Sequence, residues 1–194
     1  MGTELALKLV DDHELTVWNR TAEKTEPLVS RGATAASTPA DAVEGAELVI
    51  TCLFGPDIVR EVVIEPGLIP DGATWADATT ISPADAAAFA DAVPGYVHTP
   101  VVGSLPPARA GKLGVYVGGV DASRRSQVAD VVSPWAAANP SRLKEVDTAA
   151  GAATGKLLAN LALAVTIEGF KEALILGESQ GLSPEQVVDM LSST

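Results

Sequence analysis

The sequence predicts a doubly wound α/β domain followed by an all-helical region, and three observations lead to this fold class. Short apolar segments alternate with amphipathic segments up to about residue 147. One apolar segment, residues 47–53, has almost no polar side chain, which is typical of a strand buried on both faces of a parallel sheet. From about Gly151 the pattern is helical only. We therefore expect a first domain over residues 1–147, and a long helix with the start of a helical domain over residues 148–194.

Six segments have the composition of strands, with apolar, β-branched or aromatic residues between turn-forming residues. In chain order they are residues 14–18, 33–36, 47–53, 74–77, 96–99 and 113–118. The third ends at Gly55-Pro56, a pair that stops regular structure. Because these strands alternate with helices, the crossovers should be right-handed and the sheet mostly parallel.

The intervening segments predict helices at residues 3–10, 23–31, 57–64, 82–93 and 122–138. A further helix starts at Ser37-Thr38-Pro39, where proline occupies the first turn, and Ser82-Pro83 gives the same signal. From about Gly151 one helix continues to about Gly181, and Ser183-Pro184 opens another. A helix of about 28 residues would be about 42 Å long. Its second half therefore needs a neighbour, either a helical domain or another subunit.

The composition excludes several classes of partner. The net charge is −12, with 25 acidic and 13 scattered basic residues, which disfavours nucleic acid and anionic membranes. The single cysteine, Cys52, excludes an internal disulfide and fits a reducing compartment. His13 and His98 have no cysteine or carboxylate at ligand spacing, so no metal site is expected. There is no signal-peptide pattern and no uninterrupted apolar run of about 18 residues, so we expect a cytoplasmic protein.

Lys156 and Asn160 are the most conspicuous polar pair of the helical region. They lie four residues apart, on one face of a helix that is otherwise mostly alanine, leucine, valine and isoleucine. A charged lysine in such surroundings is costly unless it has a function. The alternative is a lysine whose stem covers apolar surface while its ammonium stays in water.

A second polar group follows the predicted strand at residues 14–18. In dinucleotide-binding α/β folds the residue at this place meets the adenosine ribose, and a basic residue there tolerates the additional phosphate of NADP. Here the strand is followed by Asn19-Arg20-Thr21, with Lys24 one turn later. The alternative is an ordinary capped helix with solvated basic residues. The chain lacks the strand and G-x-G-x-x-G loop that open such folds, and Gly2 is either the last glycine of that loop or without meaning.

Four segments together resemble the β-hydroxyacid dehydrogenases. Residues 17–43 are similar to the second βα unit of that family, and residues 77–83 (DATTISP) to its D-x-S-T-x-x-P segment. Residues 98–119 are similar to its substrate loop, and residues 151–160 (GAATGKLLAN) to its G…K-x-x-x-N helix. The family includes 3-hydroxyisobutyrate dehydrogenase and glyoxylate and succinic semialdehyde reductases, and is related to imine reductases and 6-phosphogluconate dehydrogenase. The resemblance implies a Rossmann-like sheet without its first strand, in a chain truncated at both ends.

The resemblance also implies roles for individual residues. Cofactor contacts are expected from Asn19, Arg20, Thr21, Lys24, Leu53, Phe54 and Thr80, with Arg20 favouring NADP(H) while NAD(H) stays possible. Substrate contacts are expected from Val102, Gly103 and Ser104. Lys156 would be the general acid/base, and Asn160 would orient the substrate or the lysine.

Two departures from the family concern the substrate more than the reaction. The serine of the family's substrate loop is Val102 here, and the aspartate before the proline is replaced in His98-Thr99-Pro100. We expect hydride transfer between NADP(H) and a small 3-hydroxyacid, aldehyde or keto acid, in a homodimer formed through the helical region. The alternatives are an imine reductase, in which Asp or Tyr usually replaces Lys156, and a catalytically silent nucleotide-binding or dimerisation fragment.

Overall fold

The structure is a computed structural model that describes residues 1–193. It contains two compact units, Met1–Lys156 and Leu157–Thr194. The first unit holds all the strands and the first two turns of the long helix. The second unit is helical.

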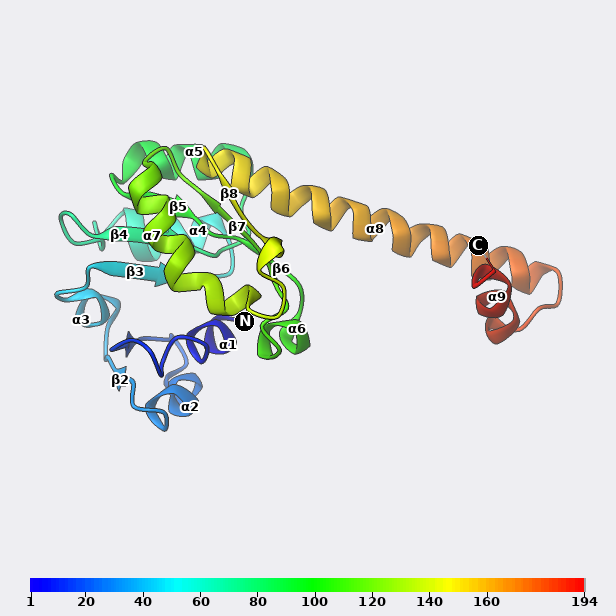
Figure 1. Ribbon diagram of the computed structural model, residues 1–194, viewed down its shortest axis with the longest axis horizontal. Helices are drawn as coiled ribbons and strands as arrows, with labels where there is room; N and C mark the ends of the chain where they lie inside the picture. The colour runs from blue at the N-terminus through cyan, green and yellow to red at the C-terminus, as the bar shows by residue number, and fades with distance from the viewer. Residues whose placement is uncertain (194) are drawn as a thin grey trace. The chain divides into compact units, whose positions relative to one another are not determined.

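A six-stranded sheet forms the centre of the first unit (Figure 1). Its strands are β3 (Leu48–Thr51), β4 (Thr74–Asp77), β5 (Tyr96–His98), β6 (Val101–Val102), β7 (Gly114–Gly118) and β8 (Leu143–Val146). β3, β4 and β5 are parallel neighbours, β5 and β6 both pair antiparallel with β7, and β8 pairs parallel with β7. The mostly parallel, Rossmann-like fold class is confirmed.

The two faces of this sheet bury different helices because successive strand residues point to opposite sides. On one face, Ala76, Val97 and Val115 pack with α1 (Gly2–Ala6) and α7 (Ala122–Val132) in the first core cluster. On the other face, Trp75 and Tyr96 pack with residues of α4, α5 and α8. These three helices span Pro56–Val59, Pro83–Ala92 and Ala149–Ser179.

A separate two-stranded sheet lies beside the larger one. It pairs β1 (Thr16–Val17) with β2 (Thr34–Ala35) in parallel, around a small core of Val10, Leu28 and Ala33. Between these strands lie the 3-10 helix Ala22–Thr25 and α2 (Glu26–Val29), and α3 (Pro39–Val43) follows with a Thr38–Asp41 capping box. Within residues 1–193, β3 has β4 as its single strand neighbour. The other edge of β3 is the place that the first strand of the expected Rossmann-like sheet would occupy.

Several elements differ from the sequence-based expectations. The helix expected at residues 122–138 ends at Val132 and continues as a 3-10 turn, Ser133–Ala136, which contains Pro134. α4 continues as one π-helical turn, Arg60–Ile64. Four elements were not expected: β6, β8, α6 (Leu105–Arg109) and the 3-10 turn Pro140–Arg142. β6 and α6 are too short for a periodic signal, and β8 carries the exposed Lys144 and Glu145.

The second unit consists of most of α8 and the shorter α9 (Pro184–Leu191). α9 begins with a capping box in which Ser183 and Gln186 exchange hydrogen bonds. Gly177 permits close packing of the two helices, because a β-carbon there would lie 2.2 Å from Cγ2 of Val187. By length and composition α8 could cross a membrane, but it carries Glu168, Lys171 and Glu172, and this criterion alone is weak.

Candidate active site

The carboxyl ends of β3, β4 and β5 lie side by side and form the floor of the candidate site. Thr51 pairs with Asp77, and Asp77 pairs with His98. The loops that follow β3 and β4 contain the predicted cofactor residues Leu53, Phe54 and Thr80. In α/β sheets, ligands bind outside the carboxyl ends of the strands. The topology therefore places these three residues at the binding edge.

A buried hydrogen-bond network ties the two loops together. Asp77 Oδ1 accepts a 2.8 Å bond from Thr51 Oγ1 and a 3.0 Å bond from the Thr79 amide. Thr79 Oγ1 in turn accepts a 2.9 Å bond from the Leu53 amide. Trp75 Nε1 donates to Thr51 Oγ1 over 2.9 Å. One carboxylate thus fixes the start of both loops.

The other side of Asp77 contacts two buried aromatic side chains. Tyr96 donates a 3.3 Å bond to Asp77 Oδ2, and its hydroxyl lies 3.1 Å from Nδ1 of His98. Burial lowers the pKa of His98 to about 3, so its 3.9 Å approach to Asp77 is a contact of a neutral ring and not an ion pair. Burial raises the pKa of Asp77, against the hydrogen bonds from Thr79, Thr51 and Tyr96. Nε2 of His98 has no hydrogen-bond partner within residues 1–193.

The start of α8 packs on the face of the sheet that carries Trp75 and Tyr96. A β-carbon on Gly118 would lie 2.6 Å from Cβ of Ala152, and one on Gly155 would lie 2.6 Å from Cε1 of Tyr116. The two glycines therefore allow close contact between helix and strand. Because the contacts move from Gly118 to Tyr116, α8 runs back along β7, toward the end of β6. Since His98, the last residue of β5, pairs with Gly118, that direction leads Lys156, the next residue, toward the side of the sheet on which the parallel strands end.

Lys156 is half-buried, and it lies one turn after the fully buried Ala152 and Ala153. Burial lowers the pKa of its ammonium below that of an ordinary lysine. It has no ion pair or hydrogen bond to its side chain within the described residues. Asn160 is exposed on the same helix, four residues later and in the second unit. Its role stays a prediction.

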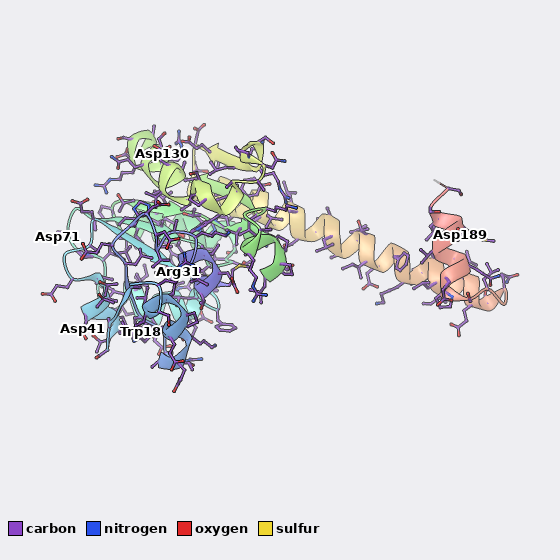
Figure 2. All side chains as sticks on the ribbon, turned by 60° about the horizontal axis from the view of Figure 1, so that its bottom comes forward. Trp18, Arg31, Asp41, Asp71, Asp130 and Asp189 are labelled. Carbon is purple, nitrogen blue, oxygen red and sulfur yellow. The ribbon has the colours of Figure 1, made fainter. Side chains whose placement is uncertain are left out.

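The four residues predicted to meet the adenosine end are all exposed: Asn19, Arg20, Thr21 and Lys24. Asn19 Oδ1 accepts a 2.9 Å bond from the Thr21 amide, which orders the turn after β1. Trp18, labelled in Figure 2, directly precedes this turn. The guanidinium of Arg20 has no partner within residues 1–193 and is free to bind an anion.

The loops after β3 and β4 present an apolar and a polar side chain to solvent. Phe54 is 93% exposed, and Gly55 follows with a φ of +156° that permits the turn. Thr80 is exposed, whereas Thr79 is buried in the network. A flat apolar side chain, free hydroxyls and an unpaired arginine fit the parts of a dinucleotide. Leu53, Phe54 and Thr80 could hold its nicotinamide end.

The predicted substrate loop follows β6. Val102 is half-buried, and Gly103 has a φ of +139° that places a would-be β-carbon 2.7 Å from Cδ2 of Leu113. Glycine is therefore required at this position. Ser104 precedes α6 as its N-cap residue, but its exposed hydroxyl makes no capping bond. That hydroxyl is available to a ligand.

Sequence reasoning missed the buried network, although one signal pointed to it. The segment Thr74–Asp77 ends a fully buried strand in a carboxylate, which is unusual unless the carboxylate is hydrogen-bonded. The sequence offers no ligand spacing around His98, and the structure buries it in this network. The pairing with Thr51 and Tyr96 depends on strand register, which the sequence does not contain.

The fold and the carboxyl edge described above are those of a dinucleotide-binding domain. Residues 1–148 match the family model described as the NAD binding domain of 6-phosphogluconate dehydrogenase. The chain belongs to this family of NAD(P)-dependent oxidoreductases.

Individual relatives narrow the class further. The chain is 27% identical to glyoxylate/succinic semialdehyde reductase 1 of Arabidopsis thaliana, over 98% of this chain and 68% of the relative. It is similar to 3-hydroxyisobutyrate dehydrogenase of Mycobacterium tuberculosis with L-serine, with a TM-score of 0.86 and 26% identity over 100% of this chain and 67% of that one. It is also similar to a reductive aminase of Aspergillus terreus bound to an NADPH form, cyclohexanone and allyl amine, with a TM-score of 0.78 and 26% identity over 100% and 68%. These matches support a hydroxyacid dehydrogenase or reductase and confirm the resemblance drawn from the four segments.

Proposed function

We propose that this chain carries the cofactor site and the proton donor of an NADP(H)-preferring reductase for small aldehydes or keto acids. The observation that carries the proposal is the placement of Lys156. Its side chain is half-buried and has no protein partner in the described residues, and the course of α8 along β7 leads it toward the side of the sheet on which β3 and β4 end. An unpaired, partly desolvated lysine beside a ligand edge suits proton transfer.

The chemistry requires little more from the chain. NADPH supplies, when bound, the hydride that adds to the carbonyl carbon of the substrate. As the carbon–oxygen π bond breaks, the oxygen gains negative charge, which the Lys156 ammonium stabilises. The ammonium then donates a proton from Nζ to this oxygen, leaving a neutral amine. In the oxidative direction the neutral amine accepts the proton of the alcohol, and its lowered pKa makes that form more accessible.

Arg20 supports the preference for NADP(H). Its guanidinium is exposed and unpaired within residues 1–193, and it follows β1 at the position that meets the adenosine ribose in this fold class. Thr21 and Lys24 add a hydroxyl and an ammonium nearby in the sequence. A guanidinium can bind the phosphate on the adenosine ribose of NADP in a bidentate manner, and NAD has no such phosphate.

Paired titrations with NADPH and NADH, followed by fluorescence of Trp18, Trp75 and Trp135, test the cofactor site. Tighter binding of NADPH is expected, and Arg20→Ala should remove the difference. Lys156→Met should lower kcat with succinic semialdehyde by about a hundredfold or more, as for loss of a general acid, with unchanged NADPH affinity. Turnover equal to that of the wild type would remove Lys156 from the mechanism. Lack of binding of either nucleotide would leave the catalytically silent module as the better description.

A second function, imine reduction, has one supporting observation. The reductive aminase of Aspergillus terreus is similar over the whole of this chain. Lysine at position 156 argues for the carbonyl substrate, and the two functions differ in a simple assay. A cyclic imine should be reduced at least tenfold less efficiently than succinic semialdehyde if the first proposal holds.

A homodimer formed through the helical region is part of the proposal. Along residues 157–193, several large apolar side chains are exposed, including Leu161, Val165, Ile175 and Leu176. Such a surface favours association with a second copy. Sedimentation equilibrium should give twice the 19.8 kDa chain mass, and Leu161→Glu should give the monomer.

A cytoplasmic location is proposed from the lone Cys52, which fits a reducing compartment.

A further inference from the structure

On the face of the sheet that α8 covers, three residues lie side by side across β6, β7 and the segment that leads into β8. Residues paired across neighbouring strands point to the same face. Val102 of β6 pairs with Gly114 of β7, and Tyr116 of β7 pairs with Lys144 of β8. Extending the parallel β7–β8 register by one residue before the first pair, Val115 with Leu143, places Arg142 beside Gly114. Val102, Gly114 and Arg142 thus form one row across three segments.

The missing side chain at Gly114 leaves space over β7, and the Arg142 guanidinium occupies the edge of that space. A β-carbon on Gly114 would lie 3.3 Å from Cβ of Val102 and 3.6 Å from Nη2 of Arg142. The guanidinium and Val102 therefore both lie close to the space that a side chain at position 114 would fill. Val102 offers no hydrogen bond there, so Arg142 is the polar group of this row.

Arg142 is exposed and has no ion pair and no hydrogen bond to its side chain within residues 1–193. This is unusual in a chain of net charge −12. Five other arginines, Arg31, Arg60, Arg109, Arg124 and Arg125, each pair with a carboxylate. Besides Arg142 only Arg20, the predicted phosphate ligand, is unpaired in this part of the chain. An unpaired guanidinium presents a planar fork of donors that fits a carboxylate.

The neighbouring row contains the approach of α8 to the sheet. Tyr116 lies two residues from Gly114, and its ring packs against Gly155, the residue before Lys156. Same-face positions two residues apart on a strand are about 7 Å apart. The proposed proton donor and the Arg142 guanidinium therefore belong to adjacent rows of one face. Two cations so arranged suit a short molecule with a carbonyl oxygen at one end and a carboxylate at the other.

We propose that Arg142 binds the carboxylate of an oxo-acid substrate and so determines the preference for acids over uncharged aldehydes. The inference rests on the proposed function, since it assigns the substrate class of the same site. Lys156 would bind the carbonyl oxygen, Arg142 the carboxylate, and Gly114 would leave room for the guanidinium to cross β7. The substrate class is the short aliphatic oxo acids.

The test compares succinic semialdehyde with butanal, which has the same carbon chain and lacks the carboxylate. Initial rates with NADPH are measured for the wild type, Arg142→Gln, Arg142→Lys and Lys144→Gln. Arg142→Gln should raise the KM for succinic semialdehyde about 10- to 100-fold, as for loss of a charge-assisted hydrogen bond, and change that for butanal less than about twofold. Arg142→Lys should recover part of the loss. Lys144→Gln removes a charge from the adjacent row and should behave as the wild type.

The outcomes separate this inference from the proposed function. If both aldehydes are reduced and Arg142→Gln affects them equally, or Lys144→Gln reproduces its effect, Arg142 is not the carboxylate ligand and the reductase stands. If the wild type reduces neither aldehyde, the proposed function fails, and calorimetry with succinate then decides the role of Arg142. Succinate affinity at least tenfold weaker in Arg142→Gln supports the inference, and equal affinity overturns it.

Discussion

The buried His98 should make the protein sensitive to mild acid, and the structure gives the size of the effect. Its folded-state pKa is about 3, against 6.5 for an ordinary histidine. Because the folded pKa is the lower one, the unfolded chain binds the proton more readily. His98 therefore costs no stability above pH 6.5, and it lowers the free energy of unfolding as the pH falls from 6.5 toward 3. The free energy of unfolding falls by about 1.4 kcal/mol per pH unit below 6.5, so the loss at pH 5.0 is about 2 kcal/mol.

The perturbation is His98→Asn, which removes the titration and leaves the carboxylate of Asp77 in place. Asp77 has a raised pKa, so its protonation opposes the effect of His98 as the pH falls. This contribution is retained in both proteins, and their difference isolates the histidine. The control is His13→Asn, because the chain has two histidines and His13 is exposed.

Urea unfolding at pH 7.5, 6.0 and 5.0 measures the effect for all three proteins. His98→Asn can be less stable than the wild type at pH 7.5, because Tyr96 loses a partner. The expected result is a change in their stability difference of about 2 kcal/mol between pH 7.5 and 5.0, in favour of the variant. His13→Asn should follow the wild type throughout. Parallel pH curves for His98→Asn and the wild type would refute the reasoning that a neutral, desolvated His98 is part of the fold.

Three further predictions follow from the site. Gly155→Ala should lower the Tm, because the new β-carbon would lie 2.6 Å from the Tyr116 ring. A β-carbon at Gly169 on the same helix would meet nothing within 4 Å, so Gly169→Ala should stabilise the protein by up to about 1 kcal/mol. Equal shifts of the two variants in calorimetry would contradict the contact between Gly155 and Tyr116. Thr79→Val should cost about 1–3 kcal/mol in urea unfolding and weaken NADPH binding, because it removes an acceptor from a loop amide, whereas Thr79→Ser should stay near the wild type. The rate of carbonyl reduction should fall as the pH rises through the pKa of Lys156. The midpoint should lie below the pKa of about 10.4 of a free lysine, because burial lowers the pKa of Lys156. A midpoint at or above that value in pH–rate profiles would argue against a desolvated ammonium.

Most of the fold could be predicted from local signals. The strand Thr74–Asp77 is predicted with its observed ends, and proline after serine or threonine marks the starts of α3, α5 and α9. β6 and β8 could not be predicted in this way. Each owes its strand conformation to pairing with β7, and neither has an apolar periodicity of its own.

Candidate residues could be selected from the sequence where they belong to a motif, and not where a residue acts through pairing with distant strands. Lys156 and Arg20 were selected from the sequence, and the structure leaves both without partners in the described residues. Thr80 was selected as well, yet its neighbour Thr79 holds the loop of β3. The choice between adjacent threonines depends on which one points inward.

The sequence by itself determined the alternation of strands and helices, the acidic surface, and the lysine on an apolar helix, because these follow from the order and type of residues. The tertiary structure decided which side chains share an environment. Register brought Asp77, His98 and Tyr96 into one buried network, and the glycines of β7 brought α8 and Arg142 onto the same face. Hydrogen bonds and desolvation act over a few ångströms, so they depend on spatial neighbours that lie far apart along the chain.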